Sequence, residues 1–360
     1  MSLRIQALCW LFFAALLSAA AAEDFERLHP GYADDLPPEV AAAPRHLCRL
    51  VNAVERTHLP LIPMRSDPQE QHGFGVRAKL NQSTASLLLD TGASGMLIGR
   101  RIAQRAGARA LRELSLGGVG DGGRLGGYSA VLDRIRIGEL EFEDCLVKVA
   151  DSDTVTGIDG VIGADVFASY LVEIDGPART MRLSPLPAPP EETAHRVMLR
   201  TVSEKSEPEV VPSSRSYVAP EMAHWSKALR IRHHLLVPVE VNGQPMLFGV
   251  DTGASHSMIS TTAARKVTRL VRADFSVKGV SGSVNELFAA ERVRLRFGSF
   301  DRQIGNMLSF DLARISHDDG IDISGLLGFE ILQQIDLKID YRDNLVELGY
   351  DDRRIPSWMH

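Results

Sequence analysis

One short sequence with a carboxylate occurs twice in this chain of 360 residues. D-T-G-A-S occupies residues 90–94 and recurs at residues 251–255, an offset of 161. Each copy follows an apolar run, so each aspartate is expected where a buried strand turns sharply. An apolar setting raises the pKa of a carboxyl group and makes its charge costly. Two such acids at equivalent places of a repeated unit predict a functional pair.

The two aspartates together can perform acid–base chemistry. If the two units pack about a pseudo-two-fold axis, equivalent positions near that axis meet. Asp90 and Asp251 then face each other and share one proton, because like charges so close cannot both ionise. The ionised carboxylate can deprotonate a water molecule while the protonated one donates to a carbonyl oxygen. The pair therefore predicts hydrolysis of an amide without a covalent intermediate.

The neighbours of the aspartates are expected to support this site. The hydroxyl groups of Thr91 and Thr252 can reach across the axis to the backbone of the opposite loop. Gly92 and Gly253 permit the close approach of backbone that such a turn needs. These four residues are therefore predicted to hold the two catalytic loops in place.

The repeat extends beyond the pentapeptides. Three further matches, at offsets of 161 and then 165, are Asn81 with Asn242, V-I-G at 161–163 with L-L-G at 326–328, and Asp175 with Asp340. A fixed period of this kind indicates duplication of a unit of about 110–120 residues. Each copy therefore contributes one half of the predicted site.

Both copies show the alternation typical of short strands separated by glycine-bearing turns. Strands are expected at 76–80, 86–89, 131–137, 140–149 and 171–174 in the first copy. In the second copy they are expected at 235–241, 245–250, 293–297, 335–339 and 345–348. A short helix is expected after each pentapeptide, at 98–106 and at 261–272. The predicted fold is all-β, with two related lobes and few short helices.

The elements that flank the two copies give the predicted division of the chain. A first lobe at 71–185 and a second lobe at 229–350 are joined by a proline-rich linker at 186–228, and a tail follows at 351–360. Residues 23–70 form an N-terminal segment with two alternatives, a removable prosegment or an element packed on the first lobe.

The first 22 residues predict an export signal. Arg4 precedes an apolar run, and small residues at 20–22 suit a signal peptidase. The alternative is an uncleaved membrane anchor; no later segment is long and apolar enough to span a bilayer. The expected location is therefore the periplasm or the exterior. Cys48 and Cys145 remain after cleavage, and two alternatives stay open for them, a disulfide or buried free thiols.

Composition excludes several classes of function. Lys and Arg number 40 against 46 Asp and Glu, giving a formal net charge of −6, whereas nucleic-acid binding shows as a basic surplus. Three scattered cysteines without a C-x-x-C pair exclude the usual zinc motifs. We expect no metal, no organic cofactor and no nucleic-acid partner.

The repeated D-T-G-A-S, the V-I-G and L-L-G motifs and the segment at 335–341 resemble the aspartic protease clan. The resemblance is closest to retropepsin-like bacterial aspartyl proteases, here with two lobes fused in one chain, and it spans about residues 74–184 and 232–349. It implies two β lobes with a cleft between them and catalytic roles for Asp90 and Asp251. The family also covers its substrate with a glycine-rich hairpin, the flap.

The flap is expected in two places. Residues Gly118, Val119 and Gly120 lie where the resemblance places the first flap, and Gly279 with Val280 forms the counterpart in the second copy.

The resemblance predicts an exported aspartic endopeptidase that acts as a monomer on peptide or protein substrates. The alternative is a non-catalytic protein that keeps the fold and binds peptides or envelope ligands. Pepsin-like relatives have Ser or Thr where Ala93 and Ala254 stand. With one donor fewer for the carboxylate, a mildly acidic to near-neutral optimum is expected.

Overall fold

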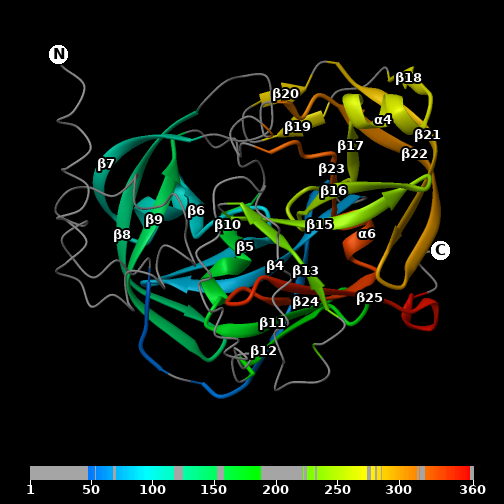
Figure 1. The fold of residues 1–360 in the computed structure, drawn as a ribbon. Helices are drawn as coiled ribbons and strands as arrows, with labels where there is room; N and C mark the ends of the chain where they lie inside the picture. Colours follow the sequence, from blue (N-terminus) through cyan, green and yellow to red (C-terminus); the bar gives the residue numbers. More distant parts are fainter. Residues whose placement is uncertain are drawn as a thin grey trace, which may run out of the picture.

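A computed structural model describes residues 48–52, 54–67, 70–116, 125–151, 158–187, 222, 225–231, 233–273, 277–279, 282–284, 286–313, 316 and 321–356 (Figure 1). The predicted export signal, most of the predicted linker and the flap residues Gly118, Val119, Gly120 and Val280 lie outside these ranges.

The first copy forms a nine-stranded sheet, seen on the left of Figure 1. Its order is β1 (Arg49–Leu50), β9 (Leu140–Ala150), β6 (Met96–Gly99), β10 (Gly160–Gly163), β5 (Ser83–Asp90), β4 (Glu70–Leu80), β8 (Leu125–Ile137) and β7 (Arg109–Leu116), with β3 (Ile62–Asp67) paired to β4. The alternation of apolar and polar residues explains these strands. In β8, for example, Leu132, Ile135 and Ile137 are buried while Arg134 and Arg136 are exposed.

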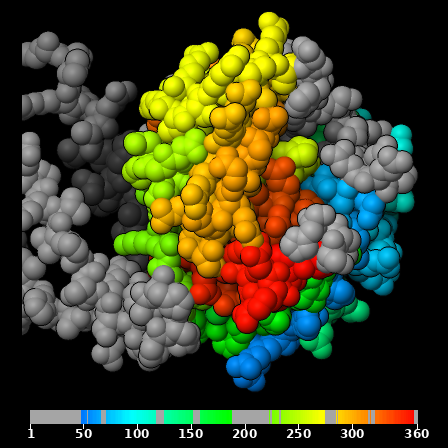
Figure 2. Space-filling view, turned by 90° about the vertical axis from the view of Figure 1, so that its right-hand side faces the viewer, coloured from blue at the N-terminus to red at the C-terminus, as the bar shows by residue number. Residues whose placement is uncertain are grey.

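The second copy forms an eight-stranded sheet of related topology. Its order is β14 (Leu229–Ile231), β15 (His234–Val241), β16 (Gln244–Val250), β23 (Gly325–Leu327), β17 (Met258–Ser260), β22 (Phe300–Phe310), β21 (Phe288–Phe297) and β18 (Leu270–Arg272). Strands β19 (Val277–Gly279) and β20 (Gly282–Val284) form a separate ribbon. In Figure 2 the orange β21 and β22 form the outer face of this lobe, with yellow segments above them and the red C-terminal strands below.

A third sheet joins the two copies. It has six strands in the order β13 (Ser226–Lys227), β25 (Leu345–Tyr350), β24 (Ile335–Asp340), β11 (Tyr170–Asp175), β12 (Thr180–Pro185) and β2 (Thr57–Pro60). At its centre β11 of the first copy pairs antiparallel with β24 of the second. Figure 1 shows this sheet running beneath both lobes. Strands β1, β2 and β3 come from the predicted N-terminal segment, so its described residues belong to these sheets.

A single hydrophobic cluster runs through both lobes and the joining sheet. The ring of Phe74 on β4 meets that of Phe329 from the second copy edge to face, with centroids 4.8 Å apart. The lobes therefore share a core, which fixes their relative position.

Equivalent turns confirm the duplication. Asn81 and Asn242 both adopt positive φ, 49° and 48°. The side-chain amide of Asn81 donates to the carbonyl of Ala106, and that of Asn242 donates to the carbonyl of Val267. Each asparagine thereby ties its hairpin to the end of the helix that follows the pentapeptide.

The helices are short, as predicted, but their bounds differ. Those whose bounds the structure describes are α3 (Arg100–Arg105), α4 (Thr261–Val267) and α6 (Phe329–Leu332), with the 3₁₀ turns η2 (Ala164–Phe167) and η4 (Asp352–Arg354). The predicted helix at 261–272 is wrong beyond Val267, because residues 270–272 pair with β21 as strand β18. Among the described residues, no helix has the length and apolar character needed to cross a bilayer.

Candidate active site

The two aspartates occupy the same place in their lobes. Asp90 ends β5, and Asp251 directly follows β16. In each lobe the strand from the V-I-G or L-L-G motif runs parallel to the strand that leads to the aspartate, so that Gly163 lies opposite Asp90. The backbone N–H of Asp251 donates to the carbonyl of Leu327 at 3.0 Å. Each aspartate therefore lies at the end of a strand that pairs with the strand of its V-I-G or L-L-G motif.

The structure brings the two carboxyl groups together. Asp251 lies close enough to Asp90 for its charge to raise the pKa of Asp90. A methyl group added at Gly253 would lie 2.3 Å from Cγ of Asp90, and one added at Gly92 would lie 2.7 Å from Cγ of Asp251. Each glycine thus leaves the space that the aspartate of the other lobe fills.

The electrostatics of the pair favour a shared proton. Burial and then the nearby charge of Asp251 raise the pKa of Asp90 well above its usual value. Backbone N–H groups of Gly92 and Ala93 offset part of this rise. Two carboxyl groups this close share one proton, and burial favours its place on Asp90.

Backbone donors orient both carboxyl groups. Oδ1 of Asp90 accepts from the N–H of Gly92 at 2.7 Å. Oδ1 of Asp251 accepts from the N–H groups of Gly253 and Ala254, both at 3.0 Å. In both lobes the donors come from the turn itself, so the turn conformation determines the orientation of the carboxylate.

The two threonines cross between the lobes. Oγ1 of Thr91 donates to the carbonyl of Val250 at 2.7 Å and accepts from the N–H of Thr252 at 3.0 Å. Reciprocally, Oγ1 of Thr252 donates to the carbonyl of Leu89 at 2.8 Å and accepts from the N–H of Thr91 at 3.0 Å. Both threonines are buried. These four bonds join the two D-T-G-A-S loops across the lobes.

A further carboxylate was missed by sequence reasoning. Asp165, which is 3% exposed, accepts from Oγ of Ser94 at 2.7 Å and from the N–H of Gly95 at 3.0 Å. Its counterpart at the offset of 165 is Glu330. The signal available in the sequence was an acidic residue two positions after the glycine of each tripeptide motif.

Comparison with known proteins identifies the family. The aspartyl protease family model matches residues 76–166 and 237–331, together just over half of the chain. The chain belongs to the aspartyl protease family. Both D-T-G-A-S copies and both tripeptide motifs lie inside the matched segments.

A solved structure of an aspartic proteinase from Irpex lacteus shares this fold. The TM-score is 0.50 at 11% identity, and the match covers 82% of this chain and 98% of that one. At this identity the likeness concerns the fold alone. No curated protein matches the sequence.

One residue of the second flap predicted for this aspartyl protease lies in a strand. Gly279 pairs with Gly282 in the ribbon formed by β19 and β20.

Across the described ranges, no group of three His, Cys, Asp or Glu side chains is placed to hold a metal ion. Cys48 and Cys145 form a disulfide, which decides between the two alternatives that the sequence left open.

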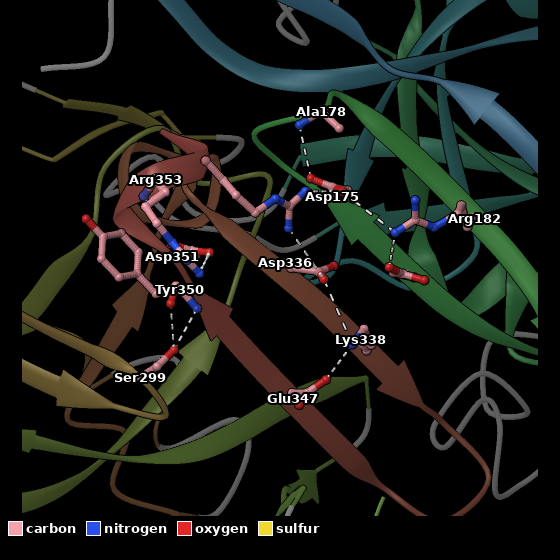
Figure 3. A network of polar contacts seen from close by, with 12 residues as sticks. Asp175, Ala178, Arg182, Ser299, Asp336, Lys338, Glu347, Tyr350, Asp351 and Arg353 are labelled. Atoms are coloured by element: carbon pink, nitrogen blue, oxygen red, sulfur yellow. Dashed lines mark hydrogen bonds and ion pairs between the residues drawn. The ribbon is translucent and has the colours of Figure 1, made fainter. Parts of the chain in front are cut away.

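A charged network spans the two lobes on the joining sheet (Figure 3). Arg354 from the C-terminal tail lies 2.5 Å from Asp175 of the first lobe and 3.8 Å from Asp336 of the second. Lys338 lies 3.9 Å from Asp336 and 2.6 Å from Glu347. Asp175 and Asp336 are direct cross-strand partners, so two carboxylates from different lobes meet here.

Proposed function

We propose that this protein is an exported aspartic endopeptidase that uses Asp90 and Asp251 as its catalytic pair. The observation that carries the proposal is the reciprocal approach of each aspartate to the glycine of the other lobe. An isolated turn aspartate has no reason to meet a second carboxyl group in the core of a protein, because the pair costs stability.

The raised pKa of Asp90 favours that residue as the proton donor of the pair. Asp251, as the carboxylate, takes a proton from a water molecule lying between the pair, and the water oxygen bonds to the carbonyl carbon of the substrate. Asp90 donates its proton to the carbonyl oxygen. When the tetrahedral intermediate collapses, the amine leaves with a proton from Asp251, the C–N bond breaks and Asp90 regains its proton. The products are a carboxylic acid and an amine.

Two further observations support the cellular context. The Cys48–Cys145 disulfide suits an oxidising compartment, and the predicted leader at residues 1–22 would deliver the chain there. Because both aspartates come from one chain, the pair is complete in a monomer. The proposed substrate is a peptide or protein, and the proposed location is the periplasm or the exterior.

The test is a peptide-library digest across pH with wild type, Asp90→Asn and Asp251→Asn. We expect wild type to cleave and both variants to lose at least about 10³-fold in kcat, since each removes one half of the acid–base pair. Asp133→Asn is the matched control, because Asp133 is exposed and, within the described residues, forms its ion pair with Arg109 at 3.2 Å on the surface. Its activity is expected to equal wild type.

Two outcomes contradict the proposal. If folded wild-type protein cleaves no peptide at any pH but binds peptides, the non-catalytic alternative holds. If cleavage survives in Asp251→Asn, the assigned mechanism is wrong. A pH–rate profile that peaks below about pH 3 contradicts the expected mildly acidic to near-neutral optimum.

A further inference from the structure

The two catalytic loops are held by different side chains. In the first lobe, Asp165 binds the loop through the hydroxyl of Ser94 and the N–H of Gly95. In the second lobe, Glu330 at the equivalent position accepts from the N–H of Ser257 at 3.0 Å and contacts Nδ1 of His256 at 2.9 Å. The imidazole of His256 thus makes the carboxylate contact that the hydroxyl of Ser94 makes in the first lobe.

The sequence explains why the loops differ. His256 occupies the position of Gly95, which has a φ of 65° that favours glycine. His256 has no positive φ, so the second loop follows another path at this point. Glu330 is one methylene longer than Asp165 and reaches the N–H one residue further along the loop. The two sequence differences, His256 for Gly95 and Glu330 for Asp165, together hold the second loop by a different set of contacts.

Contacts from α6 lead from this anchor to Asp251. The N–H of Phe329 donates to the carbonyl of Ala254 at 2.7 Å, and the N–H of Glu330 donates to the carbonyl of Ser255 at 3.1 Å. The N–H of Ala254 in turn donates to Oδ1 of Asp251 at 3.0 Å. Ala254, whose N–H orients Asp251, is therefore held through its carbonyl by the first residue of α6, next to Glu330.

Close packing makes the loop sensitive to this anchor. A methyl group at Gly328 would lie 2.4 Å from the carbonyl carbon of His256, so the loop lies directly against the start of α6. The N–H of Gly328 also donates to Oγ of Ser257 at 2.9 Å. Between the described residues, loss of the His256 contact would leave the N–H of Ser257 to join the loop to the Glu330 carboxylate.

We propose that His256 and Glu330 are a positioning pair for Asp251, with His256 fixing the second catalytic loop as Ser94 fixes the first. The inference rests on the proposed function, since it assigns these residues to the same site. Neither side chain contacts the reacting atoms; both act through the turn that orients the carboxylate. The imidazole–carboxylate contact is partly exposed, with side chains 48% and 38% accessible, so its effect is expected to be moderate.

Hydrogen exchange and kinetics test the pair. In His256→Ala we expect amide exchange in residues 251–260 to rise about threefold or more, while residues 90–99 keep wild-type exchange as the internal reference. We expect kcat to fall about threefold to tenfold with KM changed less than about twofold, because orientation rather than substrate binding is altered. His256→Asn, which keeps a donor near the position of Nδ1, should restore most of kcat.

A double-mutant cycle with Glu330→Ala separates a pair from two independent residues. If the residues act together, His256→Ala has little further effect once Glu330 is removed. His58→Ala, at an exposed position on β2, is the remote control. Unchanged exchange in residues 251–260 of His256→Ala overturns the inference, as does additivity in the cycle. If wild type cleaves nothing, the proposed function fails. Amide exchange in residues 251–260, and the double-mutant cycle measured on the free energy of unfolding, still decide whether His256 and Glu330 act as a pair.

Discussion

Glu173 and Lys338 lie directly opposite each other on β11 and β24, and they occupy equivalent positions of the two copies, 165 residues apart. A residue faces its own equivalent only where a two-fold axis passes between them. The reciprocal bonds of Thr91 and Thr252 obey the same relation. One pseudo-two-fold axis therefore relates both the joining sheet and the two loops that carry Asp90 and Asp251.

Removal of one crossing hydroxyl is expected to destabilise the protein. Thr252→Val deletes the donor to the Leu89 carbonyl and the acceptor for the N–H of Thr91, leaving two buried groups unpaired. The free energy of unfolding should fall by about 2–4 kcal/mol in denaturant titrations. Thr252→Ser keeps the hydroxyl and is the control. Equal stability of the Val and Ser variants would show that the crossing bonds contribute nothing.

Much of this architecture was accessible from the sequence. The ten predicted strands each overlap a strand of the structure, because one buried face gives clear alternation. The duplication predicts that Asp90 faces Asp251 if the units pack about a two-fold axis, and that the threonine hydroxyls are able to reach the opposite loop. These inferences needed only a repeated unit and an axis.

Features that depend on three-dimensional register were not accessible. Strands β10 and β23 are three or four residues long and buried throughout, so they show no alternation. Pairing of Cys48 with Cys145 required the distance between them. The roles of Asp165 and Glu330 depend on which loop N–H each side-chain length reaches. The contact of Asp175 with Asp336 depends on how β11 and β24 align.

The joining sheet should make stability depend on pH through Asp336. Burial, followed by the charge of Glu173, raises the pKa of Asp336 to about 6, and Lys338 partly offsets this rise. Because the pKa of Asp336 is higher in the folded than in the unfolded state, its protonated form contributes to the free energy of unfolding. This contribution is fully present below about pH 4 and is lost as pH rises through about 6. In the described part of the chain, Oδ1 of Asp336 is buried without a hydrogen-bond partner.

Asp336→Asn is therefore expected to be more stable than wild type at pH 8, by about 1–2 kcal/mol after allowance for partial exposure, and nearly equal at pH 4. Asp351→Asn is the matched control in the same network (Figure 3). Its pKa is lowered by hydrogen bonds from Arg353, so the sign is opposite and no gain at pH 8 is expected. A stability difference for Asp336→Asn that does not change between pH 4 and pH 8 contradicts this assignment.

The disulfide between Cys48 and Cys145 should stabilise the protein by restricting its unfolded state. Cys48 and Cys145 are separated by 97 residues, and a closed loop of that size restricts the unfolded chain strongly. Reduction, or Cys48→Ser, is expected to lower the free energy of unfolding by about 2–4 kcal/mol. Denaturant titration of wild type with and without reductant measures the effect. Cys48→Ser provides the control, since reductant should not change its stability further.

Substitutions at Gly92 and Gly253 give the most direct test of how closely Asp90 and Asp251 approach each other. In Gly253→Ala the new methyl group would lie 2.3 Å from both Cγ and Oδ2 of Asp90, and in Gly92→Ala it would lie 2.7 Å from Cγ of Asp251. Each substitution must displace the aspartate of the opposite lobe. Because a misplacement of about 1 Å can cost about 10²-fold in rate, we expect kcat to fall at least that far, with Gly253→Ala the more severe. Gly305→Ala on β22 is the control, since nothing lies within 4 Å of its added methyl group. Wild-type kcat and stability in both catalytic variants would mean that the aspartates do not meet as described.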